Sequence, residues 1–162
     1  MFGLTQLGIV HTIISLIAVF TGLISLILYK KISWDNTIGK TYIISTIIVC
    51  ITGFGIFQHG GFGKPHALGI ITLVVLVVAY LAGKNRLFFG QRSAAIETVC
   101  YSLTFFFHMI PGITESVTRL PLDAPLASSP DDPRIQMAVG VSFVLFLIGT
   151  IWQLRRLRAA KA

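Results

Sequence analysis

Charged side chains are scarce in this sequence, and several long stretches contain none. Only 12% of the 162 residues are Asp, Glu, Lys or Arg, whereas 54% are hydrophobic and the mean hydropathy is +0.83. Soluble domains carry about 25% charged residues, so this composition excludes an ordinary soluble domain. The charges stand in short segments between apolar runs, as they do around helices that cross a lipid bilayer. The sequence therefore predicts an integral membrane protein.

Cysteines and catalytic motifs are also rare. Cys50 and Cys100 both lie in apolar runs, where lone thiols are small core residues and no disulfide framework is indicated. The Gly60–Gly63 segment lacks the preceding strand and the Lys-Ser or Lys-Thr ending of a phosphate loop. No nucleophile elbow is present. The first residues have no basic start and no cleavage pattern, so we expect no cleaved signal peptide.

Five apolar segments have the length of transmembrane helices, which need about 20 residues to cross the hydrocarbon core. Between the last two lies a segment with four prolines, four acids and two arginines, which predicts an outer loop in which Glu115 and Arg119 can pair. We expect an all-α helical bundle that forms one transmembrane domain over residues 1–162. The predicted spans are residues 4–29, 38–57, 66–83, 94–113 and 135–154, and the predicted loop is 114–134.

Basic residues divide unequally between the two sides of these spans. Three lie on one side, Lys64, Arg119 and Arg134. Because basic loops stay in the cytoplasm, we expect an outside N-terminus and a cytoplasmic C-terminus in a bacterial inner membrane. The lipid bilayer is then the predicted partner of this basic chain, and no nucleic acid is expected. The ten residues on the other side are Lys30, Lys31, Lys40, Lys84, Arg86, Arg92, Arg155, Arg156, Arg158 and Lys161.

Small and polar residues recur every three or four positions in the first four spans. Such faces let helices approach closely and hydrogen-bond across the interface. We therefore expect a four-helix core, with the fifth span at its periphery. The faces are Gly8, His11, Ser15, Ala18, Gly22 and Ser25; Thr41, Ser45, Thr52, Gly55 and His59; His66, Gly69, Leu73, Leu76 and Tyr80; and Glu97, Tyr101, Thr104, His108 and Glu115.

All four histidines, His11, His59, His66 and His108, fall near the predicted outer ends of their spans. One interpretation is that histidine, being amphipathic, simply suits a membrane interface. A second is a cofactor site, because facing histidines in a helical bundle can bind copper, zinc or haem b. In that case His11, His66 and His108 are the predicted metal ligands. The diagonal pairs that could flank a haem are His11 with His66 and His59 with His108.

A third interpretation is a path for proton transfer. Glu97, Tyr101, Thr104 and Glu115 share the stripe of His108 and form a possible proton path, or a site for a quinol headgroup. Glu97 also lies near Arg92, where an interfacial ion pair is a simpler explanation. The three interpretations stay open on sequence alone.

Two short motifs open the second and third spans. The first is Gly39-Lys40-Thr41-Tyr42, and the second is His66-Ala67-Leu68-Gly69, followed by the apolar run Leu73–Val78. These motifs resemble a bacterial family of multi-span membrane proteins with no assigned activity. Members of that family often carry a histidine before the Gly-Lys pair, where this chain has Asp35-Asn36. More distantly, histidines on a four-helix core look like those of small b-type cytochromes.

The sequence thus predicts a small polytopic inner-membrane protein that binds haem, metal or quinone at its outer face and serves electron transfer or cofactor handling. The alternative is an accessory or assembly subunit of a larger membrane complex, without chemistry of its own. A small transporter is disfavoured because the chain has no inverted repeat.

Overall fold

The computed structural model describes residues 5–57, 61–84, 89–121 and 123–160. Within these ranges every regular element is helical and none is a strand, so the predicted all-α class is confirmed. The helices are α1 (Gln6–Tyr29), α2 (Thr37–Gly53), α3 (Lys64–Lys84), the short 3₁₀ helix η1 (Gly90–Arg92), α5 (Ser93–Arg119) and α6 (Pro133–Ala159).

Side-chain caps define where three of these helices begin. The Thr5 Oγ1 atom accepts a hydrogen bond from the Gly8 backbone N–H at 3.1 Å, and Asn36 Oδ1 accepts one from Gly39 at 2.8 Å. Asp132 likewise caps α6. Such caps satisfy backbone donors that have no partner within the helix. The short polar residues before each apolar run therefore fix the helix starts.

Four helices are long and apolar enough to cross a membrane: α1, α3, the continuous η1–α5 segment and α6. Helix α2 has 17 residues and, at 1.5 Å per residue, a length of about 25 Å. It stops before the predicted end at Phe57 because Gly53 and Gly55 flank its C-cap, Phe54, and glycine costs a helix about 1 kcal/mol relative to alanine. The predicted second span is therefore shortened.

The predicted outer loop is also shorter than expected at its start. Helix α5 continues through Pro111 to Arg119, because a proline removes only one backbone donor and the helix resumes behind it. Thr114 Oγ1 donates to the Ile110 carbonyl at 2.8 Å in this turn. The expected Glu115–Arg119 ion pair is confirmed, and it lies on the helix. The loop between α5 and α6 thus begins at residue 120.

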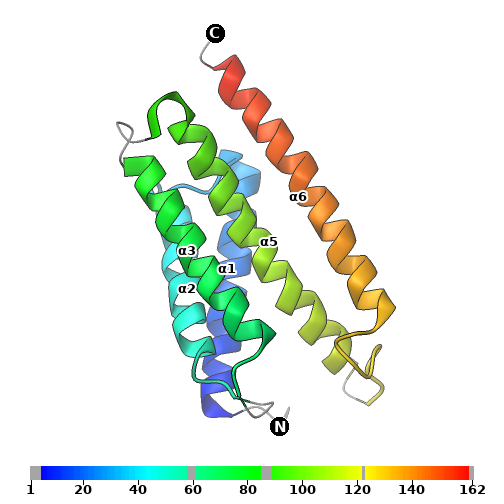
Figure 1. Ribbon diagram of the computed structural model, residues 1–162. Coiled ribbons are helices and arrows are strands. Elements are labelled where there is room, and N and C mark those ends of the chain that lie inside the picture. The colour runs from blue at the N-terminus through cyan, green and yellow to red at the C-terminus, as the bar shows by residue number, and fades with distance from the viewer. Residues whose placement is uncertain (1–4, 58–60, 85–88, 122, 161–162) are drawn as a thin grey trace.

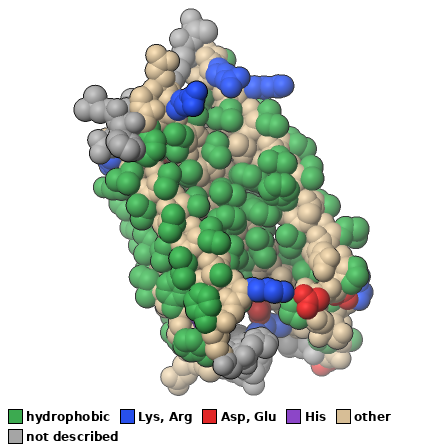
Figure 2. All heavy atoms as spheres, in the orientation of Figure 1, with side chains coloured by type: hydrophobic (Ala, Val, Ile, Leu, Met, Phe, Trp, Pro, Cys, Tyr) green, Lys and Arg blue, Asp and Glu red, His purple; other side chains and the backbone are tan. Residues whose placement is uncertain are grey.

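The helices stand side by side, with the two ends of the chain at opposite ends of the molecule (Figure 1). Helix α1 packs on α2, α2 on α3, α3 on α5, and α6 on α5. Figure 2 shows a hydrophobic belt between two polar ends: Lys and Arg lie at both ends, and the acids of this face lie at the end opposite the C-terminus. This distribution suits a bundle surrounded by lipid.

Small residues allow the helices to approach closely in the core. The predicted face of α1 is confirmed, since Gly8, Ala18, Gly22 and Ser25 are buried. A Cβ atom added at Gly22 would lie 2.6 Å from Cδ2 of Phe105 and clash with it. The face of α2 differs from the predicted one, because its buried positions are Gly39, Tyr42, Ile43, Ser45, Thr46, Val49 and Cys50.

Candidate functional site

The centre of the bundle is crossed by a hydrogen bond between α2 and α5. The Tyr42 hydroxyl lies 2.8 Å from Oγ1 of Thr104, and both side chains are fully buried. Thr104 Oγ1 donates its own proton to the Tyr101 carbonyl at 2.8 Å. Since a threonine hydroxyl has one proton, the Tyr42 hydroxyl must be the donor to Thr104. The pair therefore has a defined polarity.

One turn further along both helices, Thr46 Oγ1 lies 3.0 Å from Nε2 of His108. Thr46 donates its hydroxyl proton to the Tyr42 carbonyl at 2.8 Å, so it accepts from His108 and fixes the Nε2–H tautomer of the neutral imidazole. The His108 ring also meets the Tyr42 ring edge-on, with centroids 5.9 Å apart. Four side chains, Tyr42, Thr46, Thr104 and His108, thus form one buried polar cluster, which we call the central cluster.

His11 extends the polar region beyond the central cluster. Its Nδ1 atom lies 3.0 Å from Oγ1 of Thr52, and the Thr52 hydroxyl donates to the Ile48 carbonyl at 2.8 Å. His11 lies within electrostatic range of both His108 and Glu115. His11 and His108 are therefore each hydrogen-bonded to a threonine of α2, Thr52 and Thr46 respectively.

His66 has a different environment. Its ring stacks on Phe57 and Phe62, with centroid separations of 5.1 and 5.3 Å. Its Nδ1 atom accepts a hydrogen bond from the Gly63 backbone N–H at 3.2 Å, next to the start of α3. His66 therefore caps the start of α3, and its ring packs against two phenylalanine rings. Its Nε2 atom is buried and has no partner among the described residues.

Metal binding by His11, His66 and His108 stays a prediction. In the part of the chain that the structure describes, no group of three or more His, Cys, Asp or Glu side chains could hold a metal ion. The physical reason is that His11, His66 and His108 each bond to a different local partner. His59, the fourth predicted ligand, lies outside the described residues.

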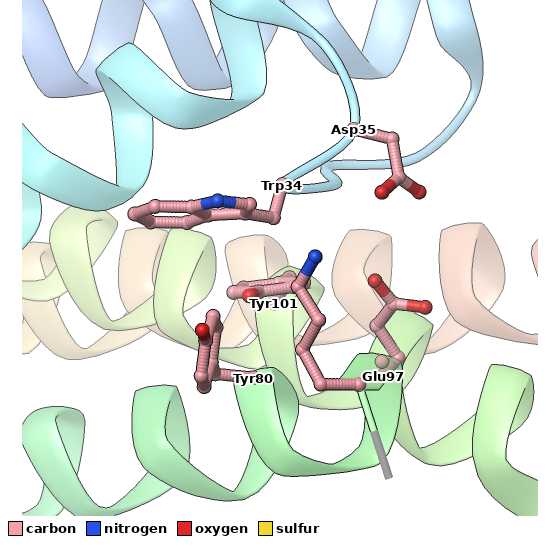
Figure 3. Close-up of a pocket in the computed structure, with 7 residues that line it drawn as sticks. Trp34, Asp35, Tyr80, Glu97 and Tyr101 are labelled. Carbon is pink, nitrogen blue, oxygen red and sulfur yellow. The ribbon is translucent and has the colours of Figure 1, made fainter. Parts of the chain in front are cut away.

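A small pocket lies at the opposite end of the bundle from the histidines. Figure 3 shows the Asp35 and Glu97 carboxylates facing one another across it, with the rings of Trp34, Tyr80 and Tyr101 around them. The Trp34 and Tyr80 rings meet edge-on at 5.6 Å. The cavity volume is about 10 Å³, close to the space that one water molecule needs.

Tyr101 connects this pocket to the interior. The side chain is fully buried, lines the pocket, and its hydroxyl has no hydrogen-bond partner among the described residues. Buried hydroxyls in proteins are normally satisfied by a protein group or by water. The pocket is therefore placed and sized for a water molecule on the Tyr101 hydroxyl, with Asp35 and Glu97 beside it.

Part of this arrangement was predicted and part was missed. Tyr101, Thr104 and His108 of the predicted proton path are buried on one face of α5, whereas Glu115 is exposed. Tyr42 and Thr46 were missed, because the face expected on the second span was displaced by one residue. Their spacing of four, with a tyrosine and a threonine inside an apolar run, was the signal that could have found them.

Comparison of the chain with known protein families, with curated proteins and with solved structures finds no match. The resemblance of its two short motifs to a bacterial membrane family therefore stays a prediction.

Proposed function

We propose that this chain is a five-span membrane protein whose central cluster transfers protons between the two ends of the bundle. One observation carries the proposal: the hydroxyls of Tyr42 and Thr104 and the imidazole of His108 are buried together with Thr46 and hydrogen-bonded across α2 and α5 in the middle of the bundle. Ionisable side chains inside a membrane are expensive and are, by default, functional.

The side chains of the central cluster are chemically suited to this task. A hydroxyl can donate one proton while it accepts another, and an imidazole can take a proton at one ring nitrogen and release one from the other. A proton taken up by His108 at Nδ1 allows release of the Nε2 proton to Thr46 Oγ1. Thr46 passes on its own proton once its hydroxyl turns from the Tyr42 carbonyl toward the Tyr42 hydroxyl, which in turn donates to Thr104. One proton enters and one leaves, so the imidazole ends with the same charge.

The two ends of the bundle provide groups for entry and exit. At one end, Asp35 and Glu97 line a pocket together with Tyr101 and Lys84. At the other end, His11 interacts electrostatically with both His108 and the exposed carboxylate of Glu115. Acids at the surface collect protons, and histidine near them exchanges protons at neutral pH.

The distribution of charge supports the orientation. The more basic end of the molecule belongs in the cytoplasm by the positive-inside rule, which directs the Asp35–Glu97 pocket inward and the histidines outward. Helix α2 then crosses the membrane between α1 and α3, and its exposed side chains Ile44, Ile48 and Ile51 face the lipid. The resemblance to a bacterial family favours the inner membrane of a bacterium.

The test is proton uptake by liposomes that contain the purified protein, driven by a potassium diffusion potential and followed with an internal pH dye. We expect uptake faster than in protein-free liposomes, and slower uptake for Tyr42→Phe, which keeps the ring and removes the hydroxyl. Uptake equal to that of protein-free liposomes would exclude proton transfer and favour the accessory-subunit alternative, in which the same hydrogen bonds only hold helices together.

A further inference from the structure

A groove opens between α5 and α6 on the outside of the bundle. Its cavity volume is about 220 Å³, and Leu26 of α1 closes one side. Most of its walls are apolar, and polar groups gather toward the end where α1 finishes. The lining side chains from α5 and α6 that matter below are Ser102, Phe106, Leu145, Phe146, Thr150 and Gln153.

The polar end of the groove is built by Gln153. Its Oε1 atom accepts a hydrogen bond from Ser102 Oγ at 2.9 Å, and its Nε2 atom donates to the Lys30 carbonyl at 2.9 Å. Gln153 therefore joins α5, α6 and the end of α1. Its amide is used by protein partners on both atoms, which leaves the neighbouring hydroxyl to face the groove.

That hydroxyl belongs to Thr150, one turn before Gln153 on the same helix. The Thr150 side chain is 8% exposed, lines the groove, and its Oγ1 atom has no hydrogen-bond partner among the described residues. A hydroxyl buried without a partner is costly. The groove thus offers one unused hydrogen-bond donor and acceptor where its apolar part ends.

Two cations follow at the membrane boundary. Lys30 is the C-cap of α1, and Arg156 lies one turn beyond Gln153 with its guanidinium 5.0 Å from the Trp152 ring centroid. Tryptophan and arginine together mark the level of lipid headgroups. From the middle of the bundle outward, the groove therefore presents apolar walls and then the Thr150 hydroxyl. Lys30 and Arg156 lie beyond its lining residues, and the Lys30 ammonium donates to the Ile27 carbonyl.

We propose that this groove binds one anionic phospholipid. An acyl chain lies along the groove against the stacked rings of Phe106 and Phe146, an ester oxygen accepts from the Thr150 hydroxyl, and the phosphate lies at Lys30 and Arg156. Lipid tails compete equally for any apolar surface in a bilayer, so specificity comes from the ester contact and the charge. The inference needs the helices to lie in a membrane, and it is independent of proton transfer.

The test is native mass spectrometry of the detergent-purified protein with phosphatidylglycerol or phosphatidylcholine. Gly149 lines the groove, and a Cβ added there meets no atom within 4 Å; Gly149→Leu therefore fills the groove without a clash. Gly140→Leu is the matched control, since it also enters open space and does not line the groove. We expect phosphatidylglycerol to bind at least about fivefold better than phosphatidylcholine, and Gly149→Leu to weaken its binding about tenfold or more.

Photolabelling of the unaltered protein gives a readout that does not depend on variant folding. Phosphatidylglycerol with a diazirine on its acyl chain should label Leu145 and Phe146 more strongly than Val141 and Val144, which are exposed and do not line the groove. Equal binding of the two lipids, equal binding by Gly149→Leu and Gly140→Leu, or even labelling around α6 would each overturn the proposal. Preferential occupation by a neutral quinone would do so as well.

Discussion

The phenolic hydroxyl of Tyr42 on α2 lies 2.8 Å from Oγ1 of Thr104 on α5, with both side chains fully buried. The two residues are 62 positions apart, so the bond joins elements that only folding brings together. Thr104 also donates to the Tyr101 carbonyl, and Thr46 bonds to both the Tyr42 carbonyl and His108. The Tyr42–Thr104 contact therefore contributes both to helix packing and to the proposed proton path.

Removal of the Tyr42–Thr104 hydrogen bond should show that the two hydroxyls contribute to the free energy of unfolding as a coupled pair. We expect Tyr42→Phe and Thr104→Val each to lower the free energy of unfolding in mixed micelles, and the double variant to lose less than the sum. Interhelical hydrogen bonds in membrane proteins contribute about 0.6 kcal/mol on average in such cycles. Tyr29→Phe, at an exposed position, is the control for loss of a phenolic hydroxyl. Strict additivity would mean that the two hydroxyls do not interact.

The close approach at Gly22 should be sensitive to a single methyl group. An added Cβ would lie 2.6 Å from Cδ2 of Phe105 and 2.8 Å from Cδ2 of Tyr42, so Gly22→Ala should lower the free energy of unfolding by about 1–3 kcal/mol. Gly140→Ala makes the same change on a helix where the Cβ meets open space. It should be neutral or slightly stabilising. Equal stability of the two variants would contradict this packing.

The membrane helices were predictable, because composition alone identifies them. Long uncharged runs predict membrane helices, and the small residues from Gly8 to Ser25 were correctly assigned to the buried face of the first helix. Helix ends were less predictable, because they depend on local competition: two glycines stop α2 at Gly53, whereas α5 passes through Pro111 and extends to Arg119.

The site was harder to predict than the fold. Histidines attract attention by their chemistry, yet His66 is used as a cap beneath two aromatic rings. Tyr42 and Thr46 are ordinary residues in an apolar run, and their role follows from the rotation of α2 about its axis. A displacement of one residue turns a helix face by about 100°, and the four-residue spacings Thr41–Ser45 and Tyr42–Thr46 indicate different faces of the same helix.

The cap that Asp132 forms at the start of α6 should be lost at low pH. Arg134 donates side-chain hydrogen bonds to the Asp132 carboxylate at 3.1 and 3.0 Å, and its backbone N–H donates at 2.8 Å. These bonds hold the pKa of Asp132 below its ordinary value of 3.8. The cap is therefore complete above pH 3.8, and its contribution is lost as the pH falls through the lower folded value.

A carboxyl titration by NMR in micelles checks this point. We expect the midpoint for Asp132 below 3.8 and a rise toward that value in Arg134→Gln, which removes the charged hydrogen bonds. An unchanged midpoint in Arg134→Gln would show that Arg134 does not stabilise the carboxylate.

The orientation can be tested with single cysteines in a background where Cys50 and Cys100 are alanine. Ser128 lies in the exposed loop between α5 and α6, and Ala160 follows α6. A membrane-impermeant maleimide should label Ser128→Cys in intact bacterial cells and Ala160→Cys only after lysis. Labelling of Ala160→Cys in intact cells would reverse the orientation.

The Tyr101→Phe variant distinguishes a structural role of the Tyr101 hydroxyl from a role in proton transfer. Its hydroxyl has no hydrogen-bond partner among the described residues, so Tyr101→Phe removes no hydrogen bond to any of them, and the free energy of unfolding should change by less than about 1 kcal/mol. Proton uptake should nevertheless fall, because the phenol joins the Asp35–Glu97 pocket to the interior. Thermal unfolding and liposome uptake on the same preparation compare the two. A stable variant with unaltered uptake would remove Tyr101 from the path.

The most direct measurement of proton transfer is potential-driven uptake into liposomes containing His108→Gln, beside the unaltered protein. Glutamine can still donate to Thr46, so stability should be nearly retained, but an amide does not exchange protons as an imidazole does. We predict rapid uptake with the unaltered protein and a loss of about tenfold or more in the variant. Uptake by His108→Gln at the rate of the unaltered protein would contradict the proposed path.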